Sequence, residues 1–360
     1  MAMDNKQKID SLLKHKVSWL EDSGPDDDIA ISSRIRLARN IKGTPFPIAA
    51  SPDQLNNTRG AIQMAVEKSN CLGASALCFE MEKLSRWERE LLLERRLVSS
   101  EFIARDGGAA LIVKRNESAG IMINEEDHIR MQALSPGFQL DEVWKIISRI
   151  DASLEKHLPF AYDSKLGYLT SCPTNVGTGM RASVMLHLPG LVLSSQINAA
   201  IQGISKLGLA VRGIFGEGSD NQGNLFQVSN QSTLGESEQQ IIERLGGVIK
   251  QLISHEKNAR LTLIEKNQYF LLDHVGRSYG ILRHAYVLSS EEALNSLSGI
   301  RIGVDMGMFS TVDLHTVNEL FLTIHPAHLQ KFAGKELSAE ERDIFRASMV
   351  RDRLKKFKNT

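Results

Sequence analysis

Arginine and glutamate side chains at separated places in the chain could together handle a phosphorylated nucleotide and a cationic acceptor. The arginines are Arg34, Arg36, Arg130, Arg181 and Arg212, and Glu126 and Glu217 lie among them. A guanidinium is planar, stays charged and donates several N–H groups, so several at one site favour a ligand with many anionic oxygens, such as a triphosphate. Carboxylates there could orient a cationic acceptor and remove its proton.

The individual segments also have plain structural interpretations. Arg34 and Arg36 would share one face of an extended strand, but they could equally form a basic strand edge that pairs with the acidic segment 26–28. Glu126 and Arg130 are four residues apart, which on a helical turn is the spacing of a surface ion pair. The chemical interpretation therefore depends on the segments occurring together.

Two more candidates lie in loop-like segments. Glu217 stands in the glycine-rich stretch 216–223 and could serve an acceptor or simply be solvated. Cys172 precedes a proline and could be an inert buried thiol, although nearby arginines would favour its reactive thiolate. The stretch 175–181 contains Gly177 and Gly179, and its exposed backbone N–H groups could cradle an anion.

Apolar patterning predicts which elements position these residues. Apolar runs at 110–114 and 120–124 predict a hairpin, so that Glu126 follows a strand. Helical spacing predicts a helix over 141–158. Short strands are expected at 166–171, 182–188, 210–214 and 225–229, and a helix at 194–206. The first part of the chain is therefore predicted to be α+β.

Beyond residue 234 the pattern is almost entirely helical. Helices are expected at 236–254, 290–297 and 312–324, and at 342–357 after a capping box made by Ser338 and Glu341. The length of 360 residues favours two domains. We expect a catalytic domain over 1–257 and an all-helical domain over 258–360.

Composition excludes several broad classes. Lysine plus arginine and aspartate plus glutamate number 43 each, so the net charge gives no general attraction to nucleic acid or to an anionic membrane. Three cysteines without metal-ligand spacing favour a reducing compartment. The first 20 residues lack the apolar stretch of a signal peptide, and a cytoplasmic protein is expected.

Taken together and in this order, the segments resemble the phosphagen kinases, the ATP:guanidino phosphotransferases. The matching segments are Ser32–Arg36, Asn124–His128, Cys172–Arg181, Arg212–Gly213 and Val228–Asn230. The resemblance implies an antiparallel sheet with flanking helices. It also implies that the five arginines hold the phosphates of ATP, with Mg²⁺ bound through the nucleotide. Glu126 then resembles the carboxylate that aligns the acceptor guanidinium and takes its proton, Glu217 a second acceptor-binding glutamate, and Cys172 the active-site cysteine.

Only 31 residues precede Ser32, too few for the helical domain that small-molecule phosphagen kinases carry there. With its helical part at the other end, the chain is similar to the bacterial protein arginine kinases. That resemblance implies a homodimer and a phosphoarginine-binding motif at Arg342, Asp343 and Arg346. It also implies protein substrates with accessible arginines, marked for a Clp chaperone-protease, and as partners a McsA-type activator and a CtsR-type repressor.

The expected function is therefore transfer of the γ-phosphoryl group of ATP to arginine side chains of proteins. Two alternatives remain at this point. The chain could be a phosphagen kinase for free arginine, or a catalytically silent adaptor that binds phosphoarginine. The short segment before Ser32 counts against the first, and the intact arginine and glutamate set counts against the second.

Overall fold

The computed structural model describes residues 4–15, 17–21, 23–213, 222–309 and 312–355, and within them an eight-stranded sheet is the central feature. Its strands are β1 (Ala30–Arg39), β2 (Leu77–Glu80), β3 (Ala110–Val113), β4 (Ala119–Ile123), β5 (Ile129–Pro136), β8 (Met180–His187), β9 (Leu209–Gly213) and β10 (Leu225–Asn230). Their order is β2-β3-β4-β5-β1-β8-β10-β9, and each pairing from β2 to β1 is antiparallel. The predicted antiparallel sheet and the predicted hairpin are confirmed.

Strand register decides which side chains share a face of the sheet. β1 pairs with β5 so that Arg36 lies opposite Gln132 and Ala38 lies opposite Arg130. Because side chains alternate along a strand, Arg34, Arg36 and Arg130 project from the same face. β1 is an interior strand between β5 and β8, so the alternative of a basic strand edge is wrong.

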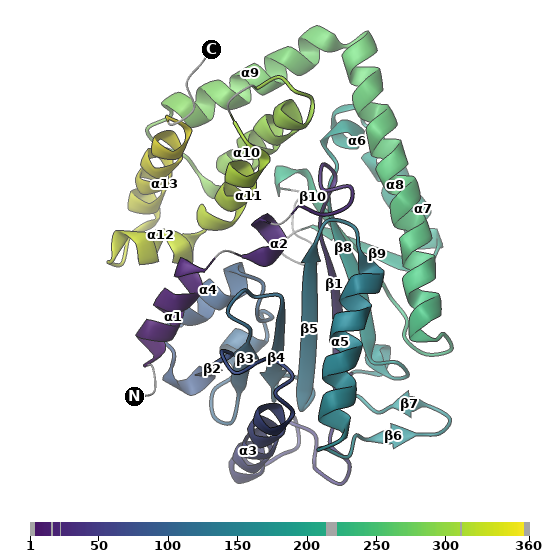
Figure 1. Ribbon diagram of the computed structural model, residues 1–360. Coiled ribbons are helices and arrows are strands. Elements are labelled where there is room, and N and C mark those ends of the chain that lie inside the picture. The colour runs from purple at the N-terminus through teal and green to yellow at the C-terminus, as the bar shows by residue number, and fades with distance from the viewer. Residues whose placement is uncertain (1–3, 16, 22, 214–221, 310–311, 356–360) are drawn as a thin grey trace. The chain divides into compact units, whose positions relative to one another are not determined.

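The opposite face of β1 is covered by helix α5 (Leu140–Glu155), which lies along β5 (Figure 1). Five apolar residues of α5 are buried, at the helical spacing that predicted this element: Leu140, Val143, Ile147, Ile150 and Leu154. Arg39 projects to this side and makes a two-pronged ion pair with Asp151 at 3.1 and 2.8 Å. Alternation along β1 thus separates a structural arginine from the two candidate phosphate ligands.

The helices predicted from the sequence are present with different ends, and the structure adds several helices that the sequence pattern did not predict. Besides α5, the helices are α1 (Asn5–Lys14), α2 (Ser18–Glu21), α3 (Pro52–Ser69), α4 (Arg86–Glu94), α6 (Pro189–Leu193), α7 (Ile197–Lys206), α8 (Glu238–Lys266), α9 (Gln268–His284), α10 (Ser290–Asp305), α11 (Leu314–Thr323), α12 (Pro326–Ala333) and α13 (Ala339–Leu354). Short 3-10 turns include η1 (Met81–Lys83), η2 (Phe102–Ala104), η3 (Pro173–Asn175) and η4 (Gln222–Asn224). The predicted capping box of Ser338 and Glu341 is confirmed at the start of α13.

One predicted strand is largely wrong. The stretch 166–171 contributes only the short β7 (Gly167–Tyr168), which pairs with β6 (Tyr162–Asp163) in a separate hairpin. Gly167, the first residue of β7, adopts a φ of 77°, and a Cβ at that position would lie 2.5 Å from the carbonyl oxygen of Gly177. Close backbone approach, which the apolar pattern does not reveal, decides this segment.

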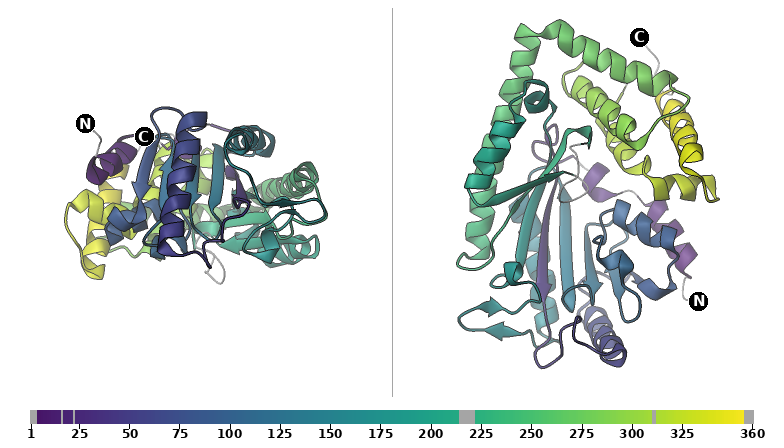
Figure 2. Two further views of the ribbon diagram at one scale, coloured as in Figure 1. Left: turned by 90° about the horizontal axis from the view of Figure 1, so that it is seen from below. Right: turned by 180° about the vertical axis from the view of Figure 1, so that it is seen from behind.

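Two compact units can be distinguished. One comprises Met1–Pro25, Ser32–Val184 and Ser229–Gly247, and the other comprises Asp26–Ile31, Met185–Val228 and Val248–Thr360. The expected domain boundary at residue 257 falls inside the long helix α8. In the second unit, α10 and α13 both pack against α9, as the two side views show (Figures 1 and 2).

Two glycines on α10 allow it to approach α9 closely. A Cβ at Gly299 would lie 2.7 Å from Cβ of Ser278, and one at Gly303 would lie 2.7 Å from Cγ1 of Val275 and from the Phe309 ring. Gly303 therefore makes room for a small apolar core whose buried members are Leu263, Leu271, Val275 and Ile302. The glycine spacing of four places both contacts on one helical face.

We expect Gly303→Ala to destabilise the protein by about 1–3 kcal/mol, because the added methyl group overpacks this contact. The free energy of unfolding from urea denaturation measures the effect. Gly280→Ala on α9 is the matched control, since nothing lies within 4 Å of a Cβ there. The control should be neutral or stabilising by up to about 1 kcal/mol. Equal stability of Gly303→Ala and the wild type would show that the contact is not tight.

Candidate functional site

Four of the five predicted phosphate-binding arginines lie together in the first unit. Arg34 and Arg36 come from β1, Arg130 from β5 and Arg181 from β8, and these three strands are neighbours in the sheet. Arg36 and Arg34 are both partly buried. Nε of Arg36 is buried and has no hydrogen-bond partner among the described residues. The sheet thus collects cationic groups from separated segments at one place.

The electrostatics of this arginine cluster show an excess of positive charge. Burial first, and then the charges of Arg130 and Arg181, lower the pKa of Arg34 to about 10. Burial and the same neighbours hold the pKa of Arg36 well below its usual value, with Arg34 adding to the effect. Holding several charged guanidinium groups together costs free energy unless an anion joins them. The cluster is therefore suited to a polyanion such as a triphosphate.

Glu125 is a carboxylate that is hydrogen-bonded directly to this cluster. It is 1% exposed, accepts two hydrogen bonds of 2.6 Å from Nη1 of Arg130, and accepts another from the hydroxyl of Ser99. Burial alone would raise the pKa of Glu125, but the charge and hydrogen bonds of Arg130 lower it overall. Arg130 lies on a strand, so the interpretation of Glu126 and Arg130 as an ion pair on a helical turn is wrong.

A set of buried hydrogen bonds fixes the segment that carries the two glutamates. Nδ2 of Asn40 donates to the Asp127 carboxylate at 2.6 Å, and Oδ1 of Asn40 accepts from the backbone N–H of His128 at 2.9 Å. Nδ1 of His128 accepts from the Ile41 N–H, so its Nε2 carries the proton that is donated to the Pro45 carbonyl. Burial lowers the pKa of His128, which favours this neutral form. The backbone that follows Glu126 is thereby held in place.

Glu126 itself is partly exposed and is a stronger base than an ordinary glutamate. Burial, followed by the charges of Asp127 and Glu125, raises the pKa of the Glu126 carboxyl. A hydrogen bond from the Cys172 side chain opposes that shift. The hydroxyl of Ser171 donates to the Glu126 carbonyl at 2.8 Å, which brings the cysteine segment alongside. The structure thus brings the predicted catalytic residues Glu126 and Cys172 together.

The glycines of the predicted anion-cradling loop have close structural neighbours. Gly177 has a φ of 111°, and a Cβ there would lie 2.3 Å from the Thr233 carbonyl oxygen. Gly179 has a φ of 63°, and a Cβ there would lie 2.6 Å from the carbonyl oxygen of Ala38. Gly179 thus brings the chain against β1 just before Arg181, and Gly177 brings it against Thr233. A role of their N–H groups in binding an anion stays a prediction.

Sequence reasoning missed one further cation near the cluster, Arg96. Burial, followed by the charge of Arg34, lowers the pKa of Arg96 to about 9. Its guanidinium carbon lies 5.6 Å from the centre of the Trp19 ring. Arg96 follows α4 and has a φ of 62°, which is unusual for a side chain other than glycine. No short motif contains it, and only the tertiary structure brings it beside Arg34.

Two predicted residues fall outside this group, one on the nucleotide side and one on the acceptor side. Arg212 lies at the end of β9 in the second unit and is partly buried. Glu217 lies outside the described residues. Their roles stay predictions.

The predicted phosphoarginine-binding residues lie on α13. Arg342 and Arg346 are one turn apart, as expected, and Nη1 of Arg342 donates to the Leu337 carbonyl at 2.9 Å. Arg346 is 1% exposed; it donates to the carbonyls of Leu288 and Ile324 and pairs with Asp343 at 2.5 Å. A ligand at Arg346 would have to compete with these contacts. Binding of phosphoarginine at this motif stays a prediction.

Comparison with known proteins gives the family. The family model for the C-terminal catalytic domain of ATP:guanido phosphotransferases matches residues 58–259, and the model for the C-terminal domain of the protein-arginine kinase McsB matches residues 268–360. The chain belongs to the ATP:guanido phosphotransferase family. Within this family it is 46% identical to the protein-arginine kinase of Halothermothrix orenii over 98% of this chain and 99% of that one. The protein-arginine kinase of Geobacillus sp. is 47% identical over 94% of each chain.

Solved structures of the family share the fold. A lombricine kinase superimposes with a TM-score of 0.56 and 22% identity, covering 68% of this chain and 70% of that one. A duplicated taurocyamine kinase from Schistosoma mansoni, with bound components of a transition-state analogue, superimposes with a TM-score of 0.58 and 24% identity. This match covers 69% of this chain and 35% of that duplicated chain. The predicted resemblance to the phosphagen kinases is confirmed.

Metal-binding clusters and membrane-spanning helices are both absent from the described residues. They contain no cluster of three or more His, Cys, Asp or Glu side chains that could hold a metal ion. None of the described helices is both long enough and apolar enough to cross a bilayer.

Proposed function

We propose that this ATP:guanido phosphotransferase transfers the γ-phosphoryl group of ATP to the guanidinium of arginine side chains in proteins. The observation that carries the proposal is the pairing of a cationic cluster on β1, β5 and β8 with a basic carboxylate at its edge. Identity of 46% and 45%, over 98% and 95% of this chain, to two proteins described as protein-arginine kinases supports the choice of acceptor.

In this proposal the arginines bind the phosphates and stabilise negative charge. Arg34, Arg36 and Arg130 donate to phosphate oxygens and stabilise the charge that develops during transfer, because phosphoryl transfer depends mainly on positioning and charge stabilisation. Glu125 orients Arg130 through its paired hydrogen bonds. Mg²⁺, bound through the nucleotide, would neutralise further phosphate charge. The excess positive charge of the cluster fits such a polyanion.

Glu126 acts as the general base. The acceptor guanidinium is protonated and delocalised, so one nitrogen must lose a proton as the bond between nitrogen and phosphorus forms and the bond to the ADP oxygen breaks. Glu126 accepts that proton, and its raised pKa improves it as a base. Glu217 would bind the other side of the acceptor.

The proposal extends to the biological setting that the resemblance implies. Phosphorylated clients would be degraded by a Clp chaperone-protease in the cytoplasm, and the enzyme would form a homodimer and respond to an activator of the McsA type. A repressor of the CtsR type would be one substrate. This extension rests on the resemblance to the protein arginine kinases; a family model of the C-terminal domain of one such kinase matches residues 268–360.

The proposal is tested by incubating the protein with Mg²⁺ and γ-labelled ATP and either an arginine-rich unfolded protein or free arginine. Acid-labile label on protein arginine is expected. Label on free arginine alone would identify a metabolic phosphagen kinase. Absence of label from both, repeated with a McsA-type activator present, would reject the kinase activity and favour a phosphoarginine-binding adaptor.

The contact between Cys172 and Glu126 predicts a change in pH dependence. Because the hydrogen bond lowers the pKa of Glu126, Cys172→Ala should raise that pKa further. The base is active when deprotonated, so the acid limb of the rate profile should move to higher pH. Cys172→Ser keeps a donor and should lie closer to the wild type. Superimposable acid limbs for the wild type and Cys172→Ala would contradict this role of the thiol.

A further inference from the structure

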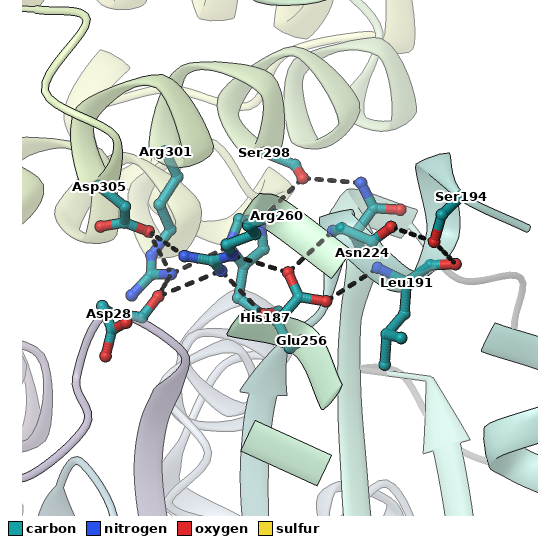
Figure 3. A network of polar contacts seen from close by, with 11 residues as sticks. Asp28, His187, Leu191, Ser194, Asn224, Glu256, Arg260, Ser298, Arg301 and Asp305 are labelled. Carbon is teal, nitrogen blue, oxygen red and sulfur yellow. Dashed lines mark hydrogen bonds and ion pairs between the residues drawn. The ribbon is translucent and has the colours of Figure 1, made fainter. Parts of the chain in front are cut away.

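Helix α10 presents a row of polar side chains whose contacts the proposed chemistry does not explain. Asn295, Ser298, Arg301 and Asp305 follow one another at intervals of three, three and four residues, so they share one side of the helix. We call this set the α10 polar face. Its first three members contact the turn η4, His187 and the backbone of residues 27 and 28, all in the second unit, and Figure 3 shows the central part of the network.

The first contact is with the turn η4. Oδ1 of Asn295 accepts the backbone N–H of Gly223 at 2.9 Å, and Oγ of Ser298 accepts from Nδ2 of Asn224 at 2.8 Å. Gly223 and Asn224 have φ values of 67° and 53°. Gly223 adopts this conformation without steric cost, whereas it is uncommon for a residue with a side chain such as Asn224, and the two hydrogen bonds to α10 hold the turn. This turn immediately follows the segment that contains Glu217.

The second contact is with His187, the last residue of β8. Nη1 of Arg301 donates to Nδ1 of His187 at 2.9 Å, so the ring proton is on Nε2 and is donated to Oγ of Ser298 at 2.8 Å. Burial, followed by the charges of Arg301 and Arg260, holds the pKa of His187 well below its usual value. The ring is therefore neutral, and its two nitrogens make hydrogen bonds with Arg301 and Ser298. The same strand carries Arg181 near its beginning.

The third contact is with the chain that leads into β1. Arg301 is fully buried and donates to the carbonyls of Asp27 and Asp28 at 2.6 and 2.8 Å. β1 begins two residues later and carries Arg34 and Arg36. A guanidinium with fixed donor geometry thus sets the direction of the backbone just before this strand.

Buried carboxylates neutralise the network. Asp305 accepts from Arg260 and Arg301 at 3.3 and 3.4 Å, and Glu256 accepts from Nε of Arg260 at 2.7 Å (Figure 3). Glu256 also receives the N–H groups of Gly190 and Leu191 at 2.8 and 2.9 Å. Burying these three ion pairs adds little stability, because desolvation offsets their attraction. Their directional hydrogen bonds instead specify one geometry.

We propose that the α10 polar face is a positioning surface for the phosphoryl-transfer site. Through Asn295, Ser298 and Arg301, the C-terminal helical region fixes the backbone next to three segments that supply the proposed ligands. The inference rests on the proposed function. None of the three residues touches the reacting groups; they act through η4, His187 and the backbone before β1.

Asn295 gives the sharpest test, because its side chain is exposed and its loss should not prevent folding. Asn295→Ala should raise KM for an arginine-containing protein by roughly tenfold or more, since misplacement of positioning groups is costly. KM for ATP should change little, because Gly223 follows the segment that contains Glu217, which is proposed to bind the acceptor and not the nucleotide. Asn295→Asp keeps an oxygen that can accept the Gly223 N–H and should restore most of the lost affinity. Glu291→Ala, at an exposed position on the same helix, is the matched control.

Ser298→Ala is a second variant. It removes the hydrogen bonds that Ser298 makes with Asn224 and His187. It should raise both KM for the acceptor and KM for ATP, because His187 ends the strand that carries Arg181. Unchanged KM values in both variants would overturn the proposal. The proposal would also be overturned if all kinetic constants worsened by the same factor and in proportion to a loss of thermal stability. That result would indicate a structural role only.

Hydrogen exchange separates failure of this inference from failure of the proposed function. Asn295→Ala should accelerate amide exchange over residues 222–230 whether or not the protein phosphorylates arginine. Unchanged exchange there would overturn the positioning role. If the wild type fails to label protein arginine, the proposed function is rejected, while the exchange measurement still decides whether α10 holds this turn.

Discussion

Replacing Glu126 with glutamine should lower kcat for phosphoryl transfer by roughly 10²–10⁴-fold and leave nucleotide affinity almost unchanged. Glutamine keeps the size of the side chain but cannot accept the proton that the acceptor nitrogen must lose. The arginines of the cluster remain in place, so the phosphates should still bind. Single-turnover transfer and equilibrium binding of ATP measure the two quantities separately.

The pH profile adds a second readout for Glu126. The carboxylate is active when deprotonated, and its pKa is raised by burial and by the neighbouring charges of Asp127 and Glu125. The wild-type rate should therefore fall, as the pH is lowered, at a higher pH than an ordinary glutamate would give, and Glu126→Gln should lack this limb. Glu142→Gln, on the exposed side of α5, is the matched control and should behave as the wild type. Turnover of Glu126→Gln at the wild-type rate would exclude Glu126 as the base.

Arg36→Met should produce opposite changes in stability and activity. The pKa of Arg36 is depressed by burial and by Arg34, Arg130 and Arg181, so its charge opposes folding when no nucleotide is bound. An apolar side chain of similar length removes that cost, and the melting temperature without ligand should rise. The variant also loses a phosphate ligand, and kcat/KM should fall by roughly 10²–10³-fold.

Three measurements test this opposition. Thermal denaturation without nucleotide, the gain in melting temperature on adding ATP, and steady-state kinetics should change together, with the ATP-induced gain reduced in Arg36→Met. Arg86→Met is the matched control because Arg86 is exposed and its ion pair is with Glu90 on the same helix. It should leave all three quantities near the wild-type values. A lower melting temperature with full activity in Arg36→Met would show that Arg36 stabilises the fold and does not bind phosphate.

Where a pattern is repeated over many residues, the sequence alone predicted the structure well. The apolar period of α5 and the capping box of α13 identified their helices, because burial of one face and satisfaction of N-terminal N–H groups are local requirements. The ends of helices were less predictable, since α10 continues to Asp305 rather than ending near residue 297. Packing of Gly299 and Gly303 against α9 supports the additional turns.

The chemistry of the site was partly determined by residue types. Arginines suited to a polyanion and glutamates suited to a guanidinium could be chosen from the sequence, and the family comparisons confirm the class of reaction. Which partner each charge takes could not be chosen in that way. Arg130 pairs with Glu125 rather than with Glu126, because β5 begins just before Arg130 and turns its side chain toward the buried carboxylate.

Some groups carry no local sequence signal, and only the tertiary structure decided where they lie. Arg96 comes close to Arg34 from a turn more than 60 residues away, and the α10 polar face reaches the chain before β1 from more than 270 residues away. Such contacts depend on strand register and helix packing, which are collective properties of the whole chain. The sequence by itself determined what chemistry its side chains could perform, and folding determined which charges stand beside one another.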